Sequence, residues 1–137
     1  MMKIVLAFFC AVLLGALATH HIPESEKHKL KQIHEECQAN PATHVDEELL
    51  KKLEDHIDDK KVGAHMLCMA VKQGFMTHDG DLINEVIKSK ITLVTHDETK
   101  VDGLLKKCAI KHETPEKTAI LLKICFKQND VHYYYDI

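Results

Sequence analysis

The chain has 137 residues, with 18 lysines and no arginine against 21 acidic residues, so its formal net charge is −3. Most nucleic-acid recognition depends on basic stripes and arginine forks, and neither is present here. These features argue against a nucleic-acid partner. The length is that of a single small domain with a core of its own.

The first eighteen residues have the composition of a secretory signal peptide. Lys3 supplies a short positive region, residues 4–17 are apolar, and residues 16–18 (Ala-Leu-Ala) match a cleavage site. The apolar stretch is shorter than the roughly 20 residues that a membrane helix needs. We therefore expect cleavage after Ala18, no membrane insertion, and a secreted, extracellular domain of residues 19–137.

Five cysteines are present, and Cys10 leaves with the signal peptide. An oxidising compartment favours disulfides among the remaining four, and four thiols allow three pairings. The sequence alone does not choose among these pairings. The four are Cys37, Cys68, Cys108 and Cys125.

Two helices are predicted in the first part of the mature chain. Pro23 begins the first, and residues 40–41 (Asn-Pro) end it. The second is predicted over residues 44–57, because its apolar residues recur every four positions. Its stripe consists of Val45, Leu49, Leu53 and Ile57. Residues 58–59 (Asp-Asp) break the pattern and offer a cap for the next helix.

Residues 62–74 (VGAHMLCMAVKQG) are predicted to form a buried central helix that ends at Gly74. The residues on its apolar face are Val62, Met66, Met69 and Ala70. Gly63 lies inside this helix, and Gly103 lies inside a later one. Each glycine marks either a close helix crossing or a weak point that costs about 1 kcal/mol.

Three further helices are predicted after a polar turn at residues 77–80. The first looks short and carries the apolar residues Leu82, Ile83, Val86 and Ile87. Residues 91–95 (ITLVT) are the one β-like run, although a linker explains them equally well. Residues 95–98 (THDE) match a capping box before a helix ending near Cys108, and residues 114–115 (Thr-Pro) begin a last helix that ends near Gln128.

This chain resembles the insect odorant-binding protein family, in particular its four-cysteine, or minus-C, subgroup. The resemblance rests on the signal peptide, the mature length, the six helices and the cysteine intervals. The six-cysteine pattern would place two more cysteines at Ala64 and Glu116, which belong to one family disulfide. The resemblance implies an all-α, compact six-helix domain around an apolar cavity. It also implies the disulfides Cys37–Cys68 and Cys108–Cys125.

The family implies a carrier that binds small hydrophobic ligands non-covalently, such as odorants, pheromones or similar semiochemicals. It further implies no cofactor or metal, possible delivery to a membrane receptor, and a monomer or weak homodimer. Periodicity shows which faces are buried but not whether they enclose a void, so ordinary core filling is the competing role for each candidate. The ligand-binding candidates are Leu53, Met66, Met69, Phe75, Leu82, Val86, Leu104, Leu105, Ile120, Ile124, Phe126 and Tyr134.

No catalytic constellation is recognisable in the sequence, so we do not expect an enzyme. Ser25 and Ser89 lack the glycines of a nucleophile elbow, and residues 34–37 (HEEC) do not complete a zinc-protease pair. Two alternatives to an odorant carrier stay open. One is an extracellular carrier in haemolymph, reproductive fluid or saliva, and the other is a disulfide-tied helical interaction protein without a cavity.

All eleven histidines lie beyond residue 18, and most should face solvent. Residues 19–21 (Thr-His-His), if freed by cleavage, could hold Cu(II) or Ni(II). His65 and His132 are candidates for a pH-dependent release of ligand. Residues 133–135 (Tyr-Tyr-Tyr) form either a lid over the cavity mouth or a frayed terminus.

Overall fold

The structure is a computed structural model that describes residues 22–136. In that range the chain forms six α-helices and one short 3-10 helix, and no strand apart from a single bridge between Met76 and Leu82. The all-α prediction is therefore confirmed, whereas the predicted signal peptide lies outside the described residues. The helices are α2 (Glu24–Ala39), α3 (Glu47–Lys51), η1 (Leu53–His56), α4 (Lys60–Lys72), α5 (Asn84–Val94), α6 (Glu98–Cys108) and α7 (Pro115–Gln128).

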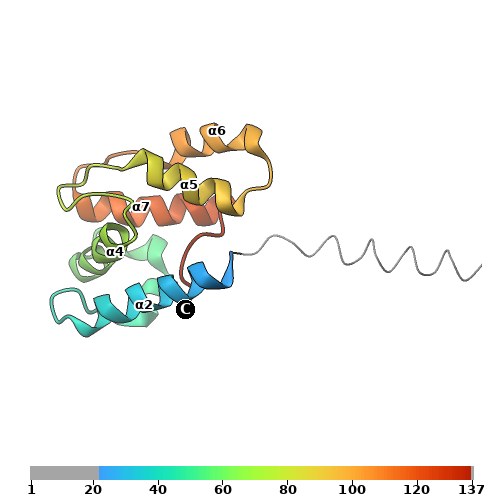
Figure 1. The fold of residues 1–137 in the computed structure, drawn as a ribbon. Coiled ribbons are helices and arrows are strands. Elements are labelled where there is room, and N and C mark those ends of the chain that lie inside the picture. The colour runs from blue at the N-terminus through green and yellow to red at the C-terminus, as the bar shows by residue number, and fades with distance from the viewer. Residues whose placement is uncertain (1–21, 137) are drawn as a thin grey trace, which may run out of the picture.

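Helices α4 and α7 pack against each other at the centre of the molecule (Figure 1). Helices α5 and α6 lie side by side over α7, and α2 lies on the opposite side, against α4. After α7 the chain turns back toward α2, so that the last residues lie close to the first described helix (Figure 1). The core between these layers is apolar, and Val62, Ile87 and Ile120 are fully buried in it.

Both disulfides that the resemblance implies are present. Cys37–Cys68 joins α2 to α4 with its Cα atoms 6.0 Å apart, and Cys108–Cys125 joins α6 to α7 with its Cα atoms 5.4 Å apart. The first bridge closes the longer loop, because its cysteines are 31 positions apart and those of the second are 17 apart. Two of the outer helices, α2 and α6, are thus each tied covalently to one of the two central helices.

Most predicted helix ends are confirmed. The Asp59 carboxylate accepts hydrogen bonds from the first free N–H groups of α4, and the Thr114 hydroxyl accepts one from the N–H of Lys117 in α7. Helix α4 ends at Lys72, and Gly74 follows with a φ of +79°, a conformation that glycine adopts without strain.

The predicted capping box at residues 95–98 was wrong by two positions. Asp97 caps α6 by accepting a hydrogen bond from the N–H of Thr99, whereas Thr95 belongs to the end of α5. The predicted short helix is longer than expected, because the β-like run after it continues α5. Ile91 and Val94 are buried there, so packing against the core overrides the strand preference of β-branched residues.

The second predicted helix, over residues 44–57, is in fact broken at Lys52, whose φ of −120° and ψ of 52° are not helical. The break separates α3 from η1. Leu53 is buried, as the predicted stripe requires, but Leu50 is buried where the stripe predicts Leu49, which is only partly buried.

The two helical glycines have different roles. A Cβ atom placed on Gly63 would lie 2.7 Å from the Cβ atom of Glu116, so α4 and α7 cross closely at this point. A Cβ atom on Gly103 would meet nothing within 4 Å. Gly63 therefore lies at a close helix crossing, and Gly103 is a weak point at an exposed position of α6.

Alanine substitutions at these two positions should have opposite effects on stability. We expect Gly63→Ala to lower the free energy of unfolding by about 1 to 3 kcal/mol through overpacking, and Gly103→Ala to raise it by about 0.5 to 1 kcal/mol. Urea unfolding of both variants measures the difference. A change in the free energy of unfolding with the same sign in both variants would contradict the close crossing at Gly63.

Candidate ligand-binding site

The most apolar cavity lies between α4, α7 and the last described residues. We call residues 131–136 the tail. Only about 30 Å³ of space remains in this cavity, which is room for about one water molecule. The protein's own side chains therefore fill it. Its lining consists of Met66, Met69, Ala70, Gln73, Phe75, Ala119, Leu122, Lys123, Phe126, Tyr133, Tyr134 and Tyr135.

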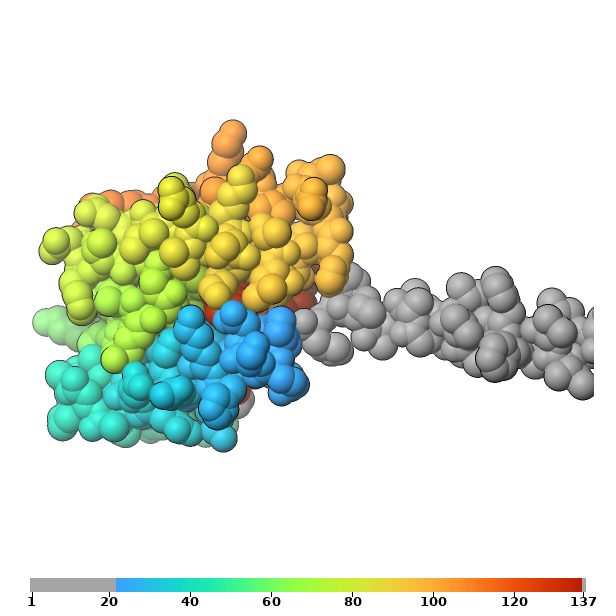
Figure 2. Space-filling model, viewed as in Figure 1, coloured from blue at the N-terminus to red at the C-terminus, as the bar shows by residue number. Residues whose placement is uncertain are grey.

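The tail fills the cavity mainly through Tyr133, which is 2% exposed. Its ring centroid lies 5.9 Å from that of Phe75, which in turn meets Phe126 edge-on at 6.1 Å. Val131 is fully buried as well. In the space-filling view the red C-terminal segment shows only in a narrow gap between α2 and the α5–α6 layer (Figure 2). Within the described residues, the tail is thus a part of the core and not a frayed end.

A polar cluster fastens Tyr133 to two helices. Its hydroxyl donates a hydrogen bond to Glu26 Oε2 at 2.5 Å, and Lys90 Nζ contacts both oxygens of that carboxylate at 3.2 and 3.3 Å. The hydrogen bond from Tyr133 is the main cause that lowers the pKa of Glu26, and burial chiefly raises the pKa of Tyr133. These three side chains, which we call the Tyr133 latch, join the tail to α2 and α5.

The backbone of the tail contributes little to its attachment. The N–H of Val131 donates to the carbonyl of Phe126, but no N–H of residues 132–136 donates to a main-chain carbonyl within residues 22–136. The tail is therefore held mostly by its side chains. It could leave the cavity without breaking a helix, at the cost of exposing Val131 and Tyr133.

Lys123 of α7 lies at the polar end of the cavity. Its Nζ donates to the carbonyl of Tyr135 at 3.4 Å and lies 5.9 Å from the ring centroid of Tyr134. Burial is the main cause that lowers its pKa to about 8. A lysine thus faces a space that is otherwise lined mostly by apolar and aromatic groups.

Two buried histidines lie beside this end. His34 Nε2 is 2.8 Å from Glu47 Oε1, and its ring stacks on Tyr135 with centroids 4.5 Å apart. His65 Nδ1 donates to the carbonyl of Thr43 at 3.0 Å, and its ring meets that of His34 edge-on. Burial is the main cause that lowers the pKa of His65 from 6.5 to about 4.

The depressed pKa of His65 makes folding sensitive to acid. Unfolded chains take up a proton at this residue below pH 6.5 while the folded chain does not until about pH 4, so stability falls as the pH drops between these values. We expect wild-type protein to lose about 2 kcal/mol from this residue between pH 7 and pH 5. His65→Asn, which keeps a donor but does not titrate, should lose less in urea unfolding at the two pH values.

The matched control is His78→Asn, because His78 is exposed in the turn before α5. It should keep the wild-type dependence on pH. An equal loss of stability in wild type and His65→Asn would show that other groups cause the acid sensitivity.

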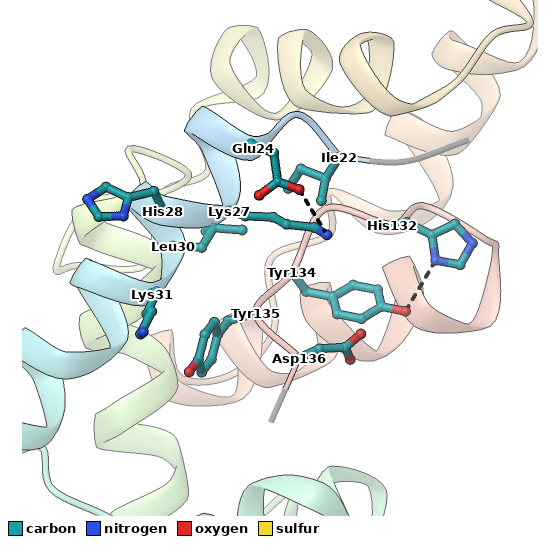
Figure 3. Close-up of a pocket in the computed structure, with 10 residues that line it drawn as sticks. All are labelled: Ile22, Glu24, Lys27, His28, Leu30, Lys31, His132, Tyr134, Tyr135 and Asp136. Carbon is teal, nitrogen blue, oxygen red and sulfur yellow. Dashed lines mark hydrogen bonds and ion pairs between the residues drawn. The ribbon is translucent and has the colours of Figure 1, made fainter. Parts of the chain in front are cut away.

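A larger, open groove of about 690 Å³ lies on the other side of the tail (Figure 3). It runs between the first turns of α2 and the tail, with charged and apolar side chains on its walls. Tyr134 and Tyr135 line both this groove and the filled cavity, so the tail is the wall between the two spaces. The groove is lined by Ile22, Glu24, Lys27, His28, Leu30, Lys31, His132, Tyr134, Tyr135 and Asp136.

The structure brings only some of the twelve ligand-binding candidates together. Those that line the filled cavity are Met66, Met69, Phe75, Phe126 and Tyr134. Three others are buried elsewhere in the core: Leu53, Ile120 and Ile124. Four are partly buried against the core and also lie outside the lining: Leu82, Val86, Leu104 and Leu105. Whether any of them touches a ligand stays a prediction.

Tyr133, which fills the cavity, and Lys123, which supplies a charged group to its wall, are not among the ligand-binding residues predicted from the sequence. A signal for Lys123 exists, because it shares one face of α7 with Ala119 and Phe126 and interrupts an apolar stripe there. No comparable periodic signal marks Tyr133, since the tail has no regular structure.

Residues 22–136 contain no candidate for a membrane span and none for a metal site. No helix there is long and apolar enough to cross a bilayer. No group of three or more His, Cys, Asp or Glu side chains in that range is placed to hold a metal ion. The possible copper or nickel site at residues 19–21 lies outside the described part.

Comparison with known proteins agrees with this fold. Residues 19–129 match the PBP/GOBP family. The B1 and B2 proteins of Tenebrio molitor are 26% and 25% identical to this chain over 123 residues, which is 88% of this chain and 93% and 94% of those proteins. No solved structure gives a significant match. The resemblance to insect odorant-binding proteins is thus confirmed, and the chain belongs to the PBP/GOBP family.

Proposed function

We propose that the protein is a secreted carrier that binds a small hydrophobic ligand, such as an odorant or pheromone, in the space now filled by the tail. Membership of the PBP/GOBP family suggests a ligand carrier and not an enzyme. The signal peptide expected at residues 1–18 supports secretion. A carrier of the same kind in haemolymph, reproductive fluid or saliva fits the same residues, and the tissue of expression would separate these settings.

The proposal rests on one observation, which is that the tail forms a wall shared by two spaces. The tail separates a filled apolar cavity from an open groove of about 690 Å³, and side chains hold it more than backbone hydrogen bonds do. Outward movement of the tail would join the two spaces and free the volume of Tyr133. About 300 Å² of buried apolar ligand surface would contribute some 7 kcal/mol before ordering costs, which is compatible with micromolar binding.

Extraction of the purified secreted protein into organic solvent, followed by mass spectrometry, tests this proposal. We expect a co-purified apolar compound, or a protein that binds a fluorescent apolar dye with one site per chain. No extracted compound together with no dye binding at micromolar protein would contradict it.

A second candidate function is a helical interaction protein with a solid core. The small remaining volume, about 30 Å³, favours it. The two functions differ in what the dye does to the tail. A carrier exchanges its tail for the dye, whereas an interaction protein with a solid core binds no dye at all.

We also propose that the chain belongs to the four-cysteine subgroup and has lost the bridge between Ala64 and Glu116. The close approach of Gly63 to Glu116 puts α4 and α7 in contact at this position. If it is the site of the lost bridge, Ala64→Cys with Glu116→Cys should form a third disulfide and stabilise the protein by about 2 to 4 kcal/mol. The measurement is thermal unfolding with and without reductant.

The alignment differs by one residue if Gly63→Cys with Glu116→Cys forms the bridge in place of the first pair. Failure of both pairs to oxidise would remove the support for a lost family bridge. A receptor at delivery and a monomer or weak homodimer stay proposals of the family resemblance.

A further inference from the structure

Lys123 is a partly buried cation without a carboxylate partner in the described part of the chain. It forms no ion pair within residues 22–136, and its one hydrogen-bond acceptor there is the carbonyl of Tyr135 at 3.4 Å. Buried charges in proteins are usually paired, because an isolated charge is costly to desolvate. A carbonyl at this distance is a weak partner for an ammonium group.

Charges of both signs act on Lys123. Lys127 further lowers its pKa, and Lys123 in turn helps to lower the pKa of His65. Asp136 and Glu54 raise the pKa of Lys123, but neither forms an ion pair with it. Because neither acid pairs with Lys123 in the described part of the chain, its ammonium group is open to the anionic group of a ligand.

The rest of the cavity is suited to a hydrocarbon chain. Met66, Phe75 and Phe126 are buried and supply its apolar walls. The tail now occupies both parts, with the Tyr133 ring among the apolar walls and the Tyr135 carbonyl at Lys123. The part of the tail that lies in the cavity thus consists of an apolar group, the Tyr133 ring, and one oxygen acceptor, the Tyr135 carbonyl.

We propose that Lys123 anchors the head group of an acidic ligand, an aliphatic carboxylic acid whose carboxylate replaces the Tyr135 carbonyl and whose chain lies against Met66 and Phe126. This inference rests on the proposed function, because the acid can enter only where the tail leaves. It adds the ligand's chemical class and the residue that selects it. An alcohol of the same chain length would fill the apolar part equally but would leave Lys123 without a counter-ion.

The test compares decanoic acid with 1-decanol as displacers of a naphthylamine dye bound to the mature protein. A charge-assisted hydrogen bond should make wild-type protein bind the acid at least about tenfold more tightly than the alcohol. Lys123→Met should abolish this preference and keep the affinity for the alcohol. Lys123→Arg should retain the preference, because it keeps the charge.

Lys106→Met is the matched control, since Lys106 is exposed on α6 and forms no ion pair in the described part. It should keep the preference for the acid. Equal displacement by acid and alcohol in wild type, or an unchanged preference in Lys123→Met, would overturn the anchor while the carrier function stands. If wild type binds no dye and neither compound shifts its thermal unfolding, both proposals fail.

Discussion

Replacing Tyr133 with alanine is expected to lower the free energy of unfolding by about 3 to 5 kcal/mol, because it removes a fully buried aromatic ring from the core. The same change should tighten dye binding, since the ring no longer competes for the cavity. Urea unfolding and dye titration of the one variant measure both effects. Loss of stability together with gain of affinity is the result that a space-filling tail predicts.

Tyr133→Phe is the matched control. It keeps the ring and removes only the hydroxyl that donates to Glu26, so it should cost about 1 to 3 kcal/mol and change dye affinity less than the alanine variant. If Tyr133→Ala weakens dye binding, the ring is a wall of the ligand site and not its occupant.

Removing the Cys37–Cys68 disulfide by a double alanine substitution is expected to destabilise the protein by about 3 to 4 kcal/mol, because its loop spans 31 positions. Loss of this bridge should also make the tail less ordered. This bridge ties α2 to α4, and α2 carries the Glu26 carboxylate of the Tyr133 latch. Urea unfolding measures the stability, and the near-ultraviolet circular dichroism of tyrosine measures the order of the tail.

The matched control removes Cys108–Cys125, which spans 17 positions and joins α6 to α7. Its loss should cost about 3 kcal/mol but leave the tyrosine signal of the folded state closer to wild type. An equal loss of that signal in both variants would show that α2 does not hold the tail.

Local signals in the sequence predicted the helices whose ends are fixed by a single side chain or turn. Asp59, Thr114 and Gly74 act as caps through contacts within a few residues, so their patterns were readable. Local patterns did not predict the break at Lys52 or the last turns of α5. In both places side chains such as Leu50 and Ile91 are buried in the core, and this tertiary packing overrides local preference.

The candidate site could be predicted in part for the same reason. Met66, Met69 and Phe126 lie on apolar faces that periodicity identifies, and they line the cavity. The position of Tyr133 depends on the path of an irregular segment and on a partner 107 residues away, Glu26, which no pattern in the sequence reveals. Periodicity identifies buried faces, but the segment that fills the space between them follows from tertiary packing.

The central claim is that ligand and tail compete for one space. The tyrosines of the tail give a spectroscopic signal that tests this claim. The chain contains no tryptophan, and its only three tyrosines are Tyr133, Tyr134 and Tyr135 in the tail. The most direct measurement is therefore near-ultraviolet circular dichroism of wild-type protein during titration with a non-aromatic apolar ligand. We predict that the tyrosine signal decreases in proportion to bound ligand and saturates at one ligand per chain. Saturable binding with an unchanged tyrosine signal would contradict the claim.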